Sequence, residues 1–106
     1  MPVVARKDGQ DTVASPDGSG VCCASPSVQK TNQGSSNVFI NGIGAVRKDD
    51  AMIVHDYAGP CCNPHAPTLS TFSPTVFVNG LNLGRVGDAF GGDHLITSGS
   101  PNVFAN

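Results

Sequence analysis

Three histidines and four cysteines are the side chains in this sequence best suited to bind a transition metal. The histidines are His55, His65 and His94, and the cysteines form two adjacent pairs, Cys22-Cys23 and Cys61-Cys62. Imidazole and thiolate are common protein ligands of zinc, and the spacing from Cys62 to His65 is short enough to chelate one ion. Because no export signal is visible, metal or thiol chemistry is a better interpretation of the cysteines than a disulfide framework.

Two other kinds of chemistry remain open for these residues. A zinc hydrolase needs three protein ligands, an open coordination position and a nearby general base. The stretch from Phe90 to His94 is the one place for such a site, and nothing around it supplies a cleft for a small-molecule substrate, so we expect no enzyme. A small zinc- or thiol-binding module, such as a redox protein or a metallochaperone, would instead use the two cysteine pairs and keep their thiols reactive.

A β-hairpin centred on Asn79-Gly80 organises the rest of the chain. Residues 75–78 are β-branched or aromatic, which suits a half-buried strand. Asn-Gly is a strong signal for a two-residue type I′ turn, and residues 81–83 return with strict alternation of apolar and polar side chains. The predicted register sets Val78 opposite Leu81.

The same pattern occurs three times along the chain. Residues 36–47 repeat the whole hairpin, and residues 100–106 repeat only its first strand. The missing return strand matches residues 2–6 at the other end of the chain, with Arg6 in the place of Arg47. Because such repeats decide the architecture, we expect a permuted array of three hairpins in which the two termini pair to complete the third.

The composition supports a single all-β domain over residues 1–106. Glycine and proline contribute 13 and 8 residues, and polar residues make the stretch 10–35 loop-like. Only 13% of the residues are charged and the net charge is −2, so nucleic acid is not an expected partner. No apolar run approaches the roughly 20 residues that cross a bilayer.

An arginine followed by an aspartate ends each repeat. The pairs are Arg47 with Asp50, Arg85 with Asp88 and, in the first copy, Arg6 with Asp8. We expect these side chains to be solvated turn residues whose ion pairs contribute little to stability.

The repeats resemble the PAAR-repeat proteins, which form the tip of the central spike in contractile phage tails and type VI secretion systems. The family's Pro-Ala-Ala-Arg motif is degenerate here, and its three counterparts are Pro2-Val3-Val4-Ala5-Arg6, Gly44-Ala45-Val46-Arg47 and Leu83-Gly84-Arg85. Two other phrases look very like the family's recurring R-x-G-D and G-S-P-x-V, namely Arg85-Val86-Gly87-Asp88 and Gly99-Ser100-Pro101-Asn102-Val103-Phe104. The resemblance covers almost the whole chain.

This resemblance implies a small cone of three pseudo-threefold β-hairpin repeats, with zinc bound near the apex. It also implies a base that sits on a trimeric β-helical spike protein, one tip per trimer, and a role in piercing the membrane of a target cell. Because no toxin or adaptor extension is visible at either end of this sequence, we expect the baseplate tip of a phage virion, with the type VI apparatus of a Gram-negative bacterium as the alternative. No signal peptide is visible, so we expect assembly in the cytoplasm.

We predict one closed, tetrahedral zinc site whose ligands are His55, His65, His94 and one cysteine thiolate. His55 and His94 occupy nearly equivalent places in two connections between hairpins, so symmetry favours Cys23 from the first connection. Local chelation with His65 favours Cys62 instead. Iron is the alternative metal, because imidazole and thiolate also suit it.

Overall fold

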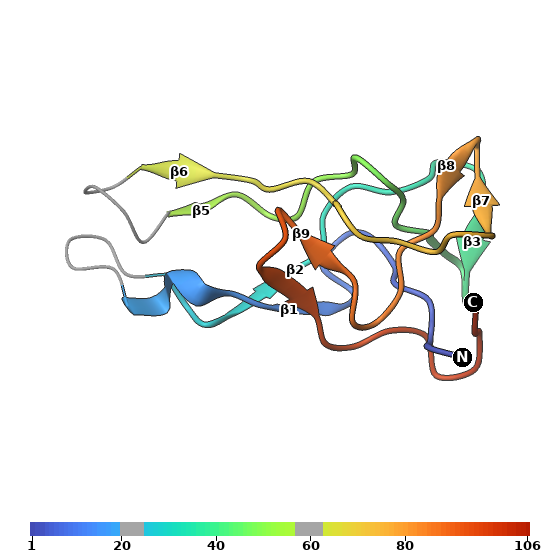
Figure 1. Cartoon of the computed structure of the whole chain (residues 1–106), viewed down its shortest axis with the longest axis horizontal. Helices are drawn as coiled ribbons and strands as arrows, with labels where there is room; N and C mark the ends of the chain where they lie inside the picture. Colours follow the sequence, from blue (N-terminus) through green and yellow to red (C-terminus); the bar gives the residue numbers. More distant parts are fainter. Residues whose placement is uncertain (20–24, 57–62) are drawn as a thin grey trace.

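The computed structural model describes residues 1–19, 25–56 and 63–106, and it shows an all-β molecule (Figure 1). The strands are β1 (Thr12–Ala14), β2 (Val28–Lys30), β3 (Phe39–Ile40), β4 (Ile43–Gly44), β5 (His55–Asp56), β6 (Pro64–His65), β7 (Phe77–Val78), β8 (Leu81–Asn82), β9 (Ala89–Phe90) and β10 (His94–Ile96). One 3₁₀ turn, η1 (Pro16–Ser19), follows β1. No helix within the described ranges is long and apolar enough to cross a membrane.

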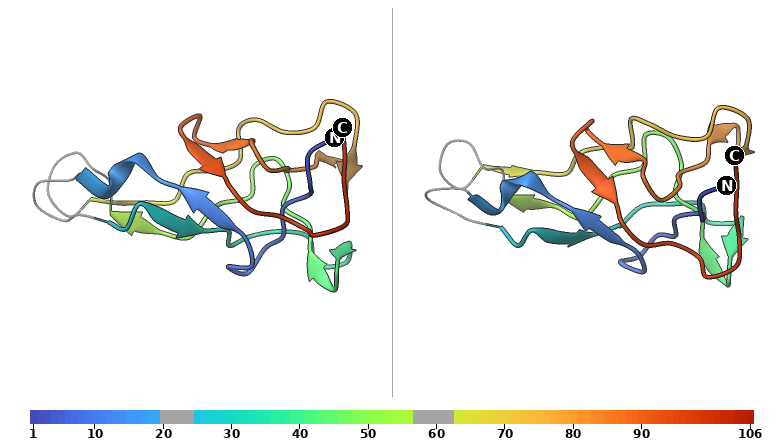
Figure 2. Two further views of the ribbon diagram at one scale, coloured as in Figure 1. Left: turned by 90° about the horizontal axis from the view of Figure 1, so that it is seen from below. Right: turned by 60° about the horizontal axis from the view of Figure 1, so that its bottom comes forward.

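Three hairpins gather at the end of the molecule that holds both termini, which we call the base (Figures 1 and 2). In β7–β8, Asn79 and Gly80 have φ angles of 53° and 77°, as a type I′ turn requires. Val78 lies opposite Leu81, so the predicted register is confirmed. The hairpin β3–β4 has the same turn and the same register.

The two termini complete the third hairpin, as the repeat pattern predicted. The backbone N–H of Val4 donates to the carbonyl of Val103 at 2.9 Å, and that of Ala105 donates to the carbonyl of Pro2 at 3.1 Å. Figure 2 shows the first and last residues side by side at the base.

Backbone bridges join the three copies into a closed ring. Each arginine pairs with the residue two positions before the next arginine, in the pairs Arg6–Ala45, Arg47–Leu83 and Arg85–Val4. Side chains join the copies as well, because the turn residue Asn79 accepts a hydrogen bond from Ser35 and Asn41 accepts one from Ser100. This closure gives the base its pseudo-threefold arrangement.

The arginine–aspartate pairs are largely buried clamps, so the expectation of solvated surface pairs was wrong. The later copies have the expected partners, in Arg47–Asp50 and Arg85–Asp88. In the first copy the partner is Asp11: its carboxylate accepts hydrogen bonds from the backbone N, Nε and Nη2 of Arg6 at 2.6, 3.1 and 2.9 Å. These bonds raise the pKa of the Arg6 guanidinium, against the opposing effect of desolvation. Asp8 is 68% exposed.

The first connection contains regular structure that its polar composition did not predict. β1 and β2 lie within residues 10–35 and join β9 and β10 in a four-stranded sheet of order β2-β1-β10-β9. Val13 of β1 pairs with Ile96 of β10, far away in the sequence. Tertiary pairing therefore makes strands of segments with weak local signals.

Among the residues that the structure describes, two apolar clusters fill the interior. The first contains Ala5, Val13, Val46, Met52, Leu69, Phe90 and Ile96. The second lies among the base hairpins and contains Val4, Ala45, Val78, Leu83 and Ala105. Neither cluster includes a side chain from β5, β6 or η1, which lie toward the end opposite the base (Figure 1). Apolar packing is thus thinnest where the histidines of β5 and β6 are found.

Candidate metal centre

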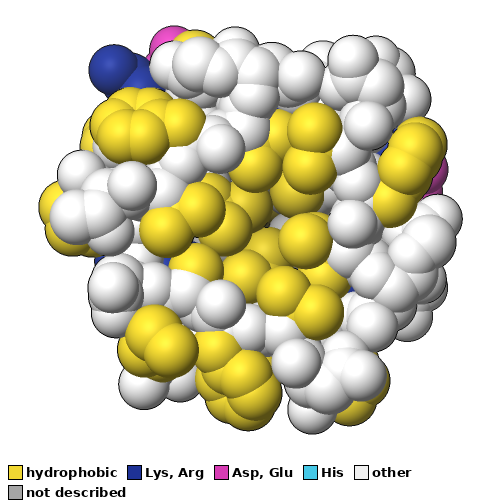
Figure 3. Space-filling model, turned by 90° about the vertical axis from the view of Figure 1, so that its right-hand side faces the viewer, with side chains coloured by type: hydrophobic (Ala, Val, Ile, Leu, Met, Phe, Trp, Pro, Cys, Tyr) yellow, Lys and Arg dark blue, Asp and Glu magenta, His cyan; other side chains and the backbone are white. Residues whose placement is uncertain are grey.

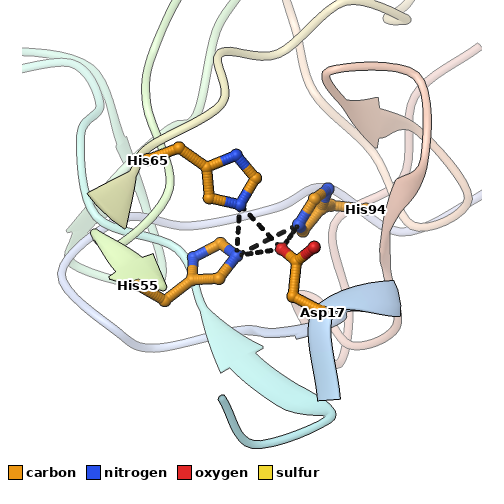
Figure 4. A group of neighbouring side chains, drawn as sticks. All are labelled: Asp17, His55, His65 and His94. Carbon is orange, nitrogen blue, oxygen red and sulfur yellow. Dashed lines mark hydrogen bonds and ion pairs between the residues drawn. The ribbon is translucent and has the colours of Figure 1, made fainter. Parts of the chain in front are cut away.

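Three histidines and one aspartate converge between η1, the hairpin β5–β6 and the start of β10 (Figure 4). One ligand atom from each of Asp17, His55, His65 and His94 lies within 4.8 Å of the others. Asp17 Oδ2 is 2.7, 2.6 and 2.9 Å from Nε2 of His55, His65 and His94. His55 Nε2 is also 2.9 Å from His65 Nε2 and 3.1 Å from His94 Nε2.

The strand pairing places the three imidazoles. His55 and His65 are directly opposite each other in the hairpin β5–β6, and residues so paired project their side chains from the same face. His94 is the first residue of β10, just after a tight turn from β9 in which Gly91 and Gly92 have φ angles of 62° and 84°. These left-handed conformations are open to glycine at no steric cost.

Asp17 is held by the 3₁₀ turn η1. Its backbone N–H donates to the side-chain oxygen of Ser15 at 3.1 Å, so Ser15 caps the turn. Pro16 opens the turn, where its fixed φ suits the first helical position. The turn thus aims the Asp17 carboxylate at the imidazoles.

A signal for Asp17 was present in the sequence but was misread. Asp17 follows Asp11 by the same six positions (17 − 11) that separate His94 from Asp88 (94 − 88). The prediction from the sequence paired Arg6 with Asp8 and not with Asp11, so this equivalence between the copies was missed. Each connection between hairpins therefore contributes to the cluster.

The cluster is buried on most sides. The side chains of Asp17 and His55 are each 3% exposed, that of His94 is 1% exposed, and that of His65 is 27% exposed. A buried carboxylate is costly unless it is paired or coordinates a metal. The burial therefore favours a permanent partner for Asp17 over a solvated charge.

Hydrogen bonds at Nδ1, the ring nitrogen that points away from the cluster, fix the orientation and tautomer of two of the imidazoles. His55 Nδ1 is 3.0 Å from the carbonyl of Ile53, and His94 Nδ1 is 2.6 Å from Oδ1 of Asp93. Carbonyls and carboxylates accept hydrogen bonds, so Nδ1 carries the proton in both rings and a neutral ring turns the lone pair of Nε2 toward the cluster. This outer contact to a carbonyl or carboxylate is typical of metal-binding histidines.

A bound metal ion would account for the close approach of these hydrogen-bond acceptors. A proton satisfies one of the contacts at a time, whereas a metal ion accepts lone pairs from all four atoms at once. Tetrahedral zinc with Zn–N bonds of about 2.0–2.1 Å holds its ligand atoms about 3.3 Å apart. The separations of 2.6–3.1 Å given above are slightly shorter and of the same order. The group could therefore hold a metal ion, and its nitrogen and oxygen donors suit both zinc and iron.

The structure brings the three predicted histidines together and adds Asp17 to them. Cys23 and Cys62 lie outside the described residues, so the predicted thiolate ligand stays a prediction. Asp17 is thus the fourth member of the group among the residues that the structure describes.

No family model matches this chain, and no curated protein matches it. The class of the molecule therefore rests on its fold and its site. It is a small all-β protein of three hairpin repeats, with an Asp-His group that could hold a metal ion.

Proposed function

We propose that this chain is the tip of the central spike of a contractile injection machine, where it caps a trimeric β-helical spike protein. The closed ring of three hairpins at the base carries the proposal. A single chain with three equivalent surfaces matches a partner with a threefold axis, so one copy caps one trimer. The resemblance to the PAAR-repeat proteins favours a phage tail baseplate first and a type VI spike second.

The base has the character of an interaction surface. Hydrophobic side chains gather at its centre, and most of the charged side chains in view lie toward its edge (Figure 3). Partly buried apolar residues of all three hairpins pack on the second cluster, namely Val38, Ile40, Val76 and Val103. An exposed apolar patch rimmed by polar groups is typical of a protein–protein contact.

In this proposal the metal ion, zinc with iron as the alternative, has a structural role. Asp17, His55, His65 and His94 would hold it, and a cysteine thiolate from Cys23 or Cys62 is the other candidate ligand. Bound there, the ion links η1 and β5–β6, which contribute no side chain to either apolar cluster, to β10. A tip that pierces a membrane must resist compression, and a closed metal site supplies rigidity that a small core lacks.

Placing a charge on the base is expected to weaken binding to the spike. Ile40 packs against the second cluster and is partly exposed on the hairpin β3–β4. In Ile40→Asp, docking would desolvate a carboxylate without a partner. We expect a loss of at least about 2 kcal/mol, or roughly 30-fold in Kd, by titration calorimetry with the trimeric spike protein proposed as the partner.

Val28→Asp is the matched control for this substitution. Val28 is 57% exposed on β2, an outer strand of the four-stranded sheet, and it lies outside the second cluster. This variant should bind the spike as the wild type does, and circular dichroism should show both variants folded. Wild-type affinity in a folded Ile40→Asp variant would rule out docking through the base.

A further inference from the structure

A surface hollow of about 360 Å³ borders the metal cluster on the side of His65. Its lining residues are His65, Ala66, Pro67, Gly91 and Asp93. His65 is also the most exposed of the four clustered side chains, at 27%. Among the described residues, the hollow therefore leads from solvent to a cluster member.

Asp93 connects this hollow to the buried part of the cluster. Its side chain is 60% exposed, yet its Oδ1 lies 2.6 Å from Nδ1 of His94, whose side chain is 1% exposed. The contact places a negative charge in the lining of the hollow, and this charge is hydrogen-bonded to the imidazole whose Nε2 faces the cluster. The turn itself does not depend on this side chain, because a backbone bond from Asp93 N to Phe90 O closes it.

We propose that Asp93 is a positioning residue of the metal centre: from the lining of the hollow through which the ion enters and leaves, it orients the buried imidazole of His94. The inference rests on the proposed metal-binding function. A carboxylate that holds the far nitrogen of a metal-bound imidazole fixes its tautomer and raises its basicity. The exposed charge of Asp93 also attracts a cation toward the hollow. Salt screens this attraction and shortens its range.

Two substitutions in the full chain separate these effects. Asp93→Asn removes the charge and keeps an acceptor oxygen, whereas Asp93→Ala removes both. The metal is first stripped with a chelator, and zinc alone is then the probe for uptake, while release is followed by stopped-flow transfer to a chromophoric chelator. We expect Asp93→Ala to release zinc about tenfold faster than the wild type. Asp93→Asn should take up zinc several-fold more slowly at low salt, with the difference shrinking at high salt.

Asp49→Asn is the control for loss of an exposed carboxylate. Asp49 has a φ of 70°, which asparagine tolerates, and it does not line the hollow. This variant should keep the wild-type rates of uptake and release. Wild-type release from Asp93→Ala, or equal slowing of uptake in the two asparagine variants, would overturn the proposed role of Asp93. If the wild-type chain binds no zinc, the metal centre itself is overturned. If it binds zinc but the rates do not depend on Asp93, only the role of Asp93 is overturned. If Asp93→Ala does not fold, the uptake rate of Asp93→Asn decides the inference.

Discussion

Removal of the metal is expected to lower the melting temperature of this protein by about 15–30 °C. An ion present at about a thousand times its Kd stabilises the folded state by roughly 4 kcal/mol, and each kcal/mol shifts the melting temperature of a domain of this size by about 4–8 °C. The effect is large because Asp17, His55 and His65 lie on η1, β5 and β6, which contribute no side chain to either apolar cluster. Thermal unfolding followed by circular dichroism, with chelator and after addition of zinc, measures it.

Variants of the ligands show which groups hold the ion. His94→Ala should melt at a low temperature whether or not chelator is present, because the site is already lost. Asp17→Ala should behave in the same way if its carboxylate is the fourth ligand, and Cys23→Ser or Cys62→Ser should do so if a thiolate is. A substitution of a residue that is not a ligand keeps the chelator-dependent shift. A chelator that strips the metal and leaves the wild-type melting temperature unchanged would contradict the structural role of the ion.

Asp11→Asn is expected to destabilise the protein by about 3–5 kcal/mol, because it leaves a buried guanidinium without its counter-charge. Asp11 is fully buried and holds three donor groups of Arg6, which anchor the first copy in the ring. Ser98 also donates a hydrogen bond to Oδ1 of Asp11, and the backbone N–H of Asp11 donates one to Oγ1 of Thr31. Urea unfolding of the metal-loaded protein measures the loss.

Asp8→Asn provides the matched comparison. Asp8 is the aspartate nearest to Arg6 in sequence, it is exposed, and its positive φ of 58° is one that asparagine accepts. Its substitution should change the free energy of unfolding by no more than about 0.5 kcal/mol. Equal losses in the two variants would contradict the assignment of the clamp to Asp11.

Local signals made the base predictable from the sequence. Asn79-Gly80 specifies a turn that only a few residue pairs permit, and strict alternation on both sides fixes the register. The match of Arg6 to Arg47 was enough to predict closure by the termini, since equivalent copies take equivalent partners. Repetition therefore supplied the long-range information that a single hairpin lacks.

The metal centre and the four-stranded sheet were harder to predict than the base, because their strands are short and the pairing of β1 with β10 is not local. β5 and β6 are each two residues long, and β1 of the four-stranded sheet forms by pairing with β10, which is far away in the sequence. The first copy also has extra residues between Arg6 and Asp11, which shifted the apparent place of its clamp and hid the equivalence of Asp17 to His94. A carboxylate in a Ser-Pro-Asp-Gly stretch indicates a turn, and nothing local marks it as a metal ligand.

The metal content of freshly purified, never-chelated protein tests the central claim most directly, that Asp17 and the three histidines surround one ion. Inductively coupled plasma mass spectrometry should find close to one equivalent of zinc, or of iron, per chain, and His94→Ala prepared in parallel should lose it. Less than about half an equivalent of either metal in the wild-type protein would contradict the metal centre.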